Sequence, residues 1–345
     1  MKKFKFIVMF LCFSIFIVFC FASCKKSELT KIKVAEVAHS VFYAPQYVAI
    51  EQGYFEEEGL EIELINANGA DKVTAALLSG DVEIGLQGPE PTIYLYNNNQ
   101  SNYLVNFAQL TQTDGSFIFG RTDIENFDLS MLKGKSILGG RKGGVPEMTL
   151  EYILKNAGLV VKQNDENVSA EKNEVNVRTD VAFGAMAGSF LSGEGDFTTL
   201  FEPTATDLVA SGKAYLLCSV GEYAGKVPYT AYSTSINYLT KNKETISKFI
   251  RAIYKGQKFV MTHTDNEVAK SMQKFFPDIS LDVLTSVVSR YRAINAWCET
   301  PYFEEDGFNR LMDIMSLAGE LDKRAPYTKL VDNTLVNEIL YHKAN

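Results

Sequence analysis

Two glutamates occupy equivalent positions in two similar segments of the chain. The segments 78–92 and 191–204 both contain Leu-Ser-Gly, an acidic turn, a short predicted strand and Glu-Pro-Thr. The glutamates of the two Glu-Pro-Thr motifs are Glu90 and Glu202. Each would lie at the start of a helix, where its carboxylate can accept hydrogen bonds from a ligand amine or can simply be favoured by the helix dipole. The repeat itself indicates two lobes of similar design.

Backbone donors precede the first of these glutamates. Gln87 and Gly88 lie where a predicted strand, 82–86, gives way to the next helix. Unpaired backbone N–H groups at a helix start can bind a hydrogen-bond acceptor. Gln87 and Gly88 are therefore candidate ligand-binding residues together with Glu90.

A glycine-rich loop, 139–144, encloses Arg141 and Lys142 and precedes a predicted helix at Pro146. Such a loop can be an anion-binding nest or a plain turn with solvated basic side chains. No Gly-Lys-Ser/Thr follows at the spacing of a nucleotide-binding P-loop, so nothing supports nucleotide hydrolysis. From this region we expect Gly143, Gly144 and Glu147 to face a ligand.

Three aromatic residues complete the candidate site. Tyr43 follows the first predicted strand, 31–38. Tyr229 and Tyr232 lie after a predicted strand at 215–220, and Trp297 is the only tryptophan. An aromatic ring can stack on a planar ligand, and it can equally well pack a core. Both interpretations stay open for each of them.

The sequence offers no catalytic or metal-binding pattern. His39, His263 and His342 share no metal-ligand spacing, and Cys218 and Cys298 form no CxxC pair. We therefore expect no metal and no cofactor, and we interpret the chain as a non-enzyme. The two cysteines can be small buried residues or can form a disulfide.

The N-terminus has the pattern of an export signal. Lysines in the first five residues precede an apolar stretch, 6–21, and then Ala22, Ser23 and Cys24. An uncleaved membrane anchor is the alternative, although 16 residues are short for one. Phe-Ala-Ser-Cys at 21–24 resembles a bacterial lipobox, which implies a signal peptide, 1–23, a lipidated Cys24 and a polar tether, 24–30.

Charge and element order restrict the class of protein. The formal charge of −8 becomes −11 without the signal peptide, and no basic face favours a nucleic-acid partner. Predicted strands and helices alternate from residue 31 to about 235, which is typical of α/β architecture with a largely parallel sheet. After Ser235 the sequence is mainly helical, over 242–262, 265–275, 281–293 and 306–319.

Several motifs together carry a family resemblance. Phe-Tyr-Ala-Pro-Gln-Tyr-Val-Ala-Ile at 42–50 and Gly-Tyr-Phe-Glu-Glu-Glu-Gly-Leu-Glu at 53–61 resemble the opening of one solute-binding family. Leu-Ser-Gly-Asp-Val-Glu-Ile-Gly at 78–85 and the segment 139–152 are similar to later signatures of that family. It includes the sulfonate-, nitrate- and thiamine-pyrimidine-precursor-binding proteins of ABC importers.

The resemblance implies a fold and a function. The expected fold is the type II periplasmic-binding-protein fold, with two α/β lobes, a ligand cleft between them and a helical C-terminal part. Lobe 1 would comprise 31–113 plus 228–345, and lobe 2 would comprise 114–227. We expect an exported, membrane-anchored, monomeric lipoprotein that captures a small solute by hinge closure and delivers it to ABC permease and ATPase subunits.

The ligand is not fixed by the sequence. If Glu90, Glu147 and Glu202 all face the cleft, they favour a ligand that donates N–H bonds, such as an aminopyrimidine precursor of thiamine. Inward-pointing Arg141 and Lys142 would favour a sulfonate, taurine or nitrate-type anion instead, and riboflavin is a further alternative. A pyrimidine-synthesising enzyme is the alternative of another class. Fungal relatives of that kind depend on a cysteine-rich segment that this chain does not contain.

Overall fold

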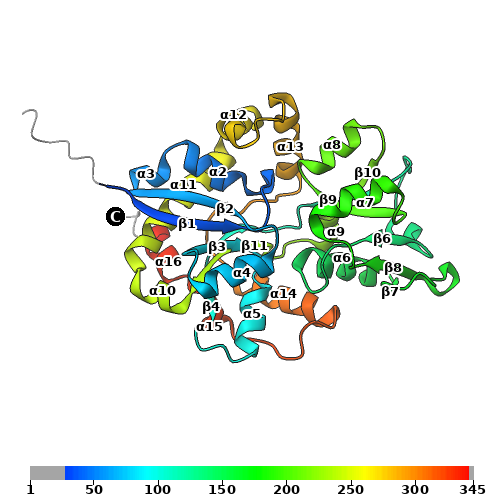
Figure 1. Cartoon of the computed structure of the whole chain (residues 1–345), viewed down its shortest axis with the longest axis horizontal. Coiled ribbons are helices and arrows are strands. Elements are labelled where there is room, and N and C mark those ends of the chain that lie inside the picture. Colours follow the sequence, from blue (N-terminus) through cyan, green and yellow to red (C-terminus); the bar gives the residue numbers. More distant parts are fainter. Residues whose placement is uncertain (1–27, 342–345) are drawn as a thin grey trace, which may run out of the picture.

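Two β-sheets form the framework of the described chain, residues 28–341 of a computed structural model, and they lie side by side along its long axis (Figure 1). The five-stranded sheet has the order β2-β1-β3-β11-β4, and the six-stranded sheet has the order β10-β5-β9-β6-β8-β7. The strands are β1 Thr30–Glu36, β2 Leu60–Asn66, β3 Ile84–Gln87, β4 Leu104–Thr111, β5 Ser116–Gly120, β6 Ser136–Leu138, β7 Val160–Gln163, β8 Glu174–Arg178, β9 Phe197–Phe201, β10 Tyr215–Ser219 and β11 Thr230–Ser235. We call the five-stranded sheet with the helices packed on it lobe 1, and the six-stranded sheet with its helices lobe 2.

The chain passes between the sheets twice, from β4 to β5 and from β10 back to β11. The first strand after each passage, β5 or β11, runs antiparallel to both of its neighbours. The two connections are in direct contact, since a Cβ added at Gly221 would lie 2.3 Å from the carbonyl oxygen of Asp114. Only glycine leaves room for this approach.

Helices cover both faces of the two sheets. The α-helices are α2 Ala44–Glu51, α3 Tyr54–Glu57, α4 Ala70–Ser79, α5 Glu90–Asn97, α6 Val145–Asn156, α7 Met186–Ser192, α8 Thr204–Ala210, α9 Val220–Ala224, α10 Ile236–Lys241, α11 Lys243–Thr262, α12 Asp265–Met272, α13 Leu281–Ala293, α14 Glu305–Leu317, α15 Tyr327–Leu330 and α16 Thr334–Tyr341. Short 3-10 turns are η1 Val41–Tyr43, η2 Leu129–Leu132, η3 Ala170–Lys172, η4 Phe183–Ala185 and η5 Gln273–Phe275.

The apolar core runs continuously through the junction of the lobes. The longest helix within residues 28–341, α11, buries Ile246, Phe249, Ile250 and Ile253 at helical spacing, so one of its faces packs into the core. The same cluster extends into the second sheet through residues such as Phe117. A smaller cluster lies entirely within lobe 2. The two lobes thus share part of one apolar core at their junction.

The expected fold class is confirmed, and the differences are local. β3 begins at Ile84, two residues later than predicted, and the loop before Pro45 contains a 3-10 turn. The edge strand β7 was not predicted, because it has four residues, exposes Val160 and shows no clear alternation. Cys24, with the predicted signal peptide and most of the tether, lies outside the described residues.

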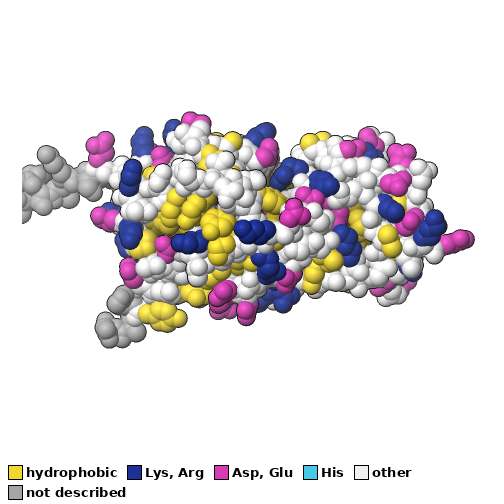
Figure 2. All heavy atoms as spheres, turned by 90° about the horizontal axis from the view of Figure 1, so that it is seen from below, with side chains coloured by type: hydrophobic (Ala, Val, Ile, Leu, Met, Phe, Trp, Pro, Cys, Tyr) yellow, Lys and Arg dark blue, Asp and Glu magenta, His cyan; other side chains and the backbone are white. Residues whose placement is uncertain are grey.

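The described surface has no dominant charge on the face seen in Figure 2. Acidic and basic side chains are interspersed there, and hydrophobic side chains gather on the half that carries the first sheet. Across residues 28–341, no helix has the length and apolarity needed to cross a membrane. Over the same range, no cluster of three or more His, Cys, Asp or Glu side chains is placed to hold a metal ion.

Candidate functional site

A cavity of about 530 Å³ lies between the two lobes. Its walls come from the segments after β1, β2 and β3 of the first sheet and after β6, β8 and β9 of the second. Carboxyl ends of strands are where open α/β sheets bind ligands. The lining includes Val37–Ser40, Phe42, Tyr43, Asn68–Lys72, Gly88, Glu90, Gly140, Arg141, Gly144–Pro146, Thr179–Gly184, Met186, Ala187, Thr199–Thr204, Tyr229 and Thr230.

Glu90 is the one candidate carboxylate with a free oxygen in this lining. It is the first residue of α5 and is only 2% exposed. Among residues 28–341, nothing donates a hydrogen bond to its Oε2 atom, and the Arg141 Nη2 atom lies 3.9 Å from Oε1. Burial raises the pKa of Glu90 to about 7, against the opposing effect of backbone N–H groups and Arg141. A ligand N–H group would satisfy the free oxygen.

Gly88 makes room for this carboxyl group. A Cβ atom at position 88 would lie 2.1 Å from Glu90 Oε2 and 2.9 Å from Val145 Cγ2. Any side chain there would displace the carboxyl group. Gly88 therefore contributes to the site by having no side chain.

Glu202 also lines the cavity, but its carboxylate is already used. Oε1 pairs with Arg290 of α13, and Oε2 accepts a hydrogen bond from the Thr206 backbone N–H at 2.9 Å. The Ser40 hydroxyl donates to the Glu202 carbonyl at 2.6 Å, and the Glu202 N–H donates to the Tyr291 hydroxyl at 3.0 Å. Glu202 thus joins the lobes, and both of its carboxylate oxygens already have partners within the described chain.

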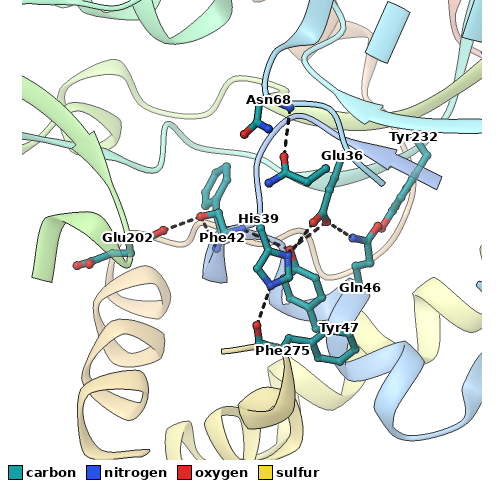
Figure 3. A network of polar contacts seen from close by, with 11 residues as sticks. Glu36, His39, Phe42, Gln46, Tyr47, Asn68, Glu202, Tyr232 and Phe275 are labelled. Atoms are coloured by element: carbon teal, nitrogen blue, oxygen red, sulfur yellow. Dashed lines mark hydrogen bonds and ion pairs between the residues drawn. The ribbon is translucent and has the colours of Figure 1, made fainter. Parts of the chain in front are cut away.

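A buried polar network fixes the loop after β1 (Figure 3). Glu36 Oε2 accepts hydrogen bonds from Gln46 at 2.8 Å and from the Tyr47 hydroxyl at 2.9 Å, and Glu36 Oε1 lies 2.8 Å from His39 Nδ1. His39 Nε2 is 2.8 Å from the Phe275 carbonyl. Both ring nitrogens face acceptors, and the hydrogen bond to Glu36 raises the pKa of His39 although burial opposes it.

Aromatic rings from both lobes form the rest of the wall. Phe42 of lobe 1 and Phe201 of lobe 2 have ring centroids 5.9 Å apart, and Tyr229 packs on both at 5.6 and 6.0 Å. Tyr43 also lines the cavity and is 5% exposed. These rings offer planar apolar contact to a small ligand.

Four predicted residues do not line the cavity. Gln87 points along the sheet, where it donates to Ser233 at 3.2 Å. Trp297 lies behind the wall, where its indole N–H donates to the Phe42 carbonyl at 2.9 Å. Glu147 turns away from the cavity and accepts a hydrogen bond from the Gly143 N–H at 3.0 Å, so both residues serve an internal contact.

Several lining residues were not predicted. Ser40, Asp71, Lys72, Asp180 and Phe183 line the cavity and lie shortly after the ends of β1, β2 and β8. The strand-end rule could have located them, since it applies to every parallel strand. Arg141, the basic residue whose direction was left open, does face the cavity, whereas Lys142 is not in its lining.

Comparison with known proteins identifies related sequences. The model of the "NMT1/THI5 like" family matches residues 41–267. "Putative binding protein YtlA" of Bacillus subtilis is 39% identical over 331 residues, which are 96% of each chain. The 4-amino-5-hydroxymethyl-2-methylpyrimidine phosphate synthase of Aspergillus parasiticus is 22% identical over 233 residues, 64% of this chain and 63% of that protein.

A solved structure supports the same fold. The periplasmic aliphatic sulphonate binding protein SsuA of Escherichia coli matches with a TM-score of 0.65 and 14% identity, over 87% of this chain and 97% of that one. At this identity the likeness concerns the fold alone. It agrees with the two sheets and the two connections described above.

Proposed function

Because the chain belongs to the NMT1/THI5-like family, we propose that it is the extracytoplasmic substrate-binding protein of an ABC importer and captures a small organic solute. The observation that carries this proposal is the cavity of about 530 Å³ with walls from both lobes. Small-molecule sites have roughly this size and commonly lie between lobes. ABC permease and ATPase subunits would be the partners.

Hinge closure is the proposed mechanism. The moving units would be 31–113 with 228–345 and 114–227, joined by the connections next to Thr111 and Thr230. These two residues pair across the connections, since their hydroxyl oxygens lie 2.6 Å apart. Closure of the lobes would add contacts from the second wall and exclude water from the ligand.

An aminopyrimidine of the thiamine-precursor type is the ligand we propose. The support comes from Glu90, whose free oxygen can accept an N–H bond, and from the rings of Phe42, Tyr229 and Phe201, which can pack against a planar heterocycle. Of the three glutamates predicted as acceptors, Glu90 alone keeps this role, because Glu202 is paired with Arg290 and Glu147 lies outside the cavity lining. An anion of the sulfonate or nitrate type is the second candidate, favoured by Arg141 in the lining.

The two cysteines of the described chain take no part in the proposed site. Cys218 and Cys298 are both free thiols in the described chain, and neither lines the cavity. Burial raises the pKa of both thiols, so neither is an activated nucleophile. The fungal synthases are distant relatives, matched over about two thirds of their length.

Titration calorimetry tests the proposal. The protein is titrated at neutral pH with hydroxymethylpyrimidine, formylaminopyrimidine, taurine, an alkanesulfonate and riboflavin in separate experiments. We expect one-site binding of a pyrimidine. Binding of a sulfonate alone would contradict the proposed ligand and keep the transport role, and binding of none of the five would contradict the proposed solute classes.

A further inference from the structure

A second contact between the lobes lies beside the cavity. Its lobe 2 side is the loop 140–145 with helix α6, and its lobe 1 side is the segment 317–320 at the end of α14, together with Tyr94 of α5. The Tyr94 hydroxyl donates to the Gly143 carbonyl at 3.1 Å, and Lys142 Nζ lies 3.4 Å from Glu320. Lys155 Nζ donates to the Leu317 carbonyl at 2.9 Å. We call this contact the latch.

Two buried carboxyl groups lie directly under the latch. Glu147 and Glu151, one turn apart on α6, are 0% and 1% exposed. The Gln163 amide donates to both, at 3.2 and 2.6 Å, so the two carboxyl groups are held close together. Glu147 accepts the Gly143 N–H, and Glu151 pairs with Lys155 at 2.6 Å. Both residues thus support groups that contact lobe 1.

The charges around Glu147 come from several elements. From α6 they are Glu151 and Lys155, from the end of α14 Glu320, and from the preceding loop Arg141 and Lys142. Helix α5 contributes the uncharged hydroxyl of Tyr94 and the carboxyl group of Glu90, which lies 3.9 Å from Arg141. β7 contributes only the uncharged Gln163. Burial, then Glu151 and more weakly Glu320, raise the pKa of Glu147 to about 8, so the pair holds a proton at neutral pH. The hydrogen bond from the Gly143 N–H opposes this rise, because it favours the ionised carboxylate.

We propose that Glu147 is a positioning residue that, while protonated, keeps the loop 140–145 seated against the end of α14, and that loss of its proton releases the latch. Two adjacent buried carboxylates, with Glu320 nearby, then repel each other, because the cations around them already face other carboxylates: Lys155 faces Glu151, Lys142 faces Glu320 and Arg141 faces Glu90. The loop that moves carries Arg141 and Gly144, which line the cavity. Release of the latch should also weaken solute binding at alkaline pH, and only this consequence rests on the proposed function.

Amide hydrogen exchange without any solute tests the latch. The readout is the protection of peptides covering 140–148 and 316–322, corrected for intrinsic exchange, from about pH 6.5 to about pH 9.5. In the wild type we expect the opening equilibrium constant of the latch to rise by up to about tenfold per pH unit above about 8. Glu147→Gln keeps a hydrogen-bonding side chain that does not ionise. In this variant the protection of the same peptides should therefore not change with pH. Glu166→Gln, an exposed control in the same lobe, should follow the wild type.

Two results would overturn the proposal. The first is wild-type protection that does not depend on pH, which can be read even if the variant folds poorly. The second is a folded Glu147→Gln protein that loses protection as the wild type does. Because no solute is present, either result leaves the proposed transport role standing, and failure to bind any solute leaves the latch standing.

Discussion

Replacing Glu90 with glutamine should make the folded protein more stable and should weaken its binding of the solute. The neutral amide has nearly the same shape as the carboxyl group but removes its ionisation. Glu90 ordinarily titrates at 4.5, and burial raises its pKa to about 7 in the folded chain. Between these values the folded state holds a proton that the unfolded chain has released, so this group lowers stability progressively as pH rises from 4.5 to 7.

The magnitude follows from the size of this shift. A change from 4.5 to about 7 corresponds to about 3 kcal/mol of unfolding free energy once pH exceeds the folded-state pKa. Glu90→Gln should therefore equal the wild type near pH 4 and exceed it by up to about 3 kcal/mol near pH 8. Urea unfolding followed by the fluorescence of Trp297, the only tryptophan and 2% exposed, measures this difference.

The binding half of the prediction has the opposite sign. A hydrogen bond to a charged group contributes about 1.5–3 kcal/mol, so hydroxymethylpyrimidine should bind Glu90→Gln roughly 10- to 150-fold more weakly above pH 7. The exposed Glu166→Gln variant serves as the control for both measurements. A stability profile parallel to the wild type from pH 4 to pH 8 would refute the assignment of a buried, perturbed carboxyl group at Glu90.

Three further changes test other parts of the structure. Gly88→Ala should lower stability by about 1–3 kcal/mol in urea unfolding and should weaken solute binding in calorimetry. Gly184→Ala is the matched control, because Gly184 also lines the cavity but has no atom within 4 Å of the added Cβ, and it should change neither measurement. Arg290→Ala should cost about 1–3 kcal/mol in urea unfolding, because it leaves the buried Glu202 carboxylate without its partly exposed cation, and an unchanged midpoint would contradict that role. Cys24→Ser should move the protein from the membrane to the soluble fraction, and unchanged fractionation would exclude a lipid anchor at this residue.

Local sequence patterns were sufficient for the fold class, for most of the elements and for part of the cavity wall, but not for β7 or α16. Alternating strand and helix signals predicted the α/β class, because each is read from a few neighbouring residues. Tyr43, Gly88, Glu90 and Gly144, which were predicted in segments that follow strands, and Tyr229, which was predicted at the return passage between the lobes, all line the cavity. The first four positions depend on where a strand stops, which local sequence does specify.

Side-chain direction could not be predicted where distant elements decide it. Glu147 turns toward Gln163 of β7 rather than into the cavity, and Trp297 is fixed by the carbonyl of Phe42, 255 positions earlier. The Glu202 carboxylate meets Arg290, 88 positions later. Such contacts exist only after the lobes and the C-terminal helices have assembled, so a helix-start glutamate and a ligand-binding glutamate look alike in the sequence.

Mass spectrometry of the solute carried by the native protein tests the central claim most directly. The protein is purified without unfolding, then denatured, and the released small molecules are identified and quantified against the protein. The account predicts about one aminopyrimidine per chain, with much less carried by Glu90→Gln. A sulfonate or nitrate-type anion released in its place, at the same level from both proteins, would contradict it.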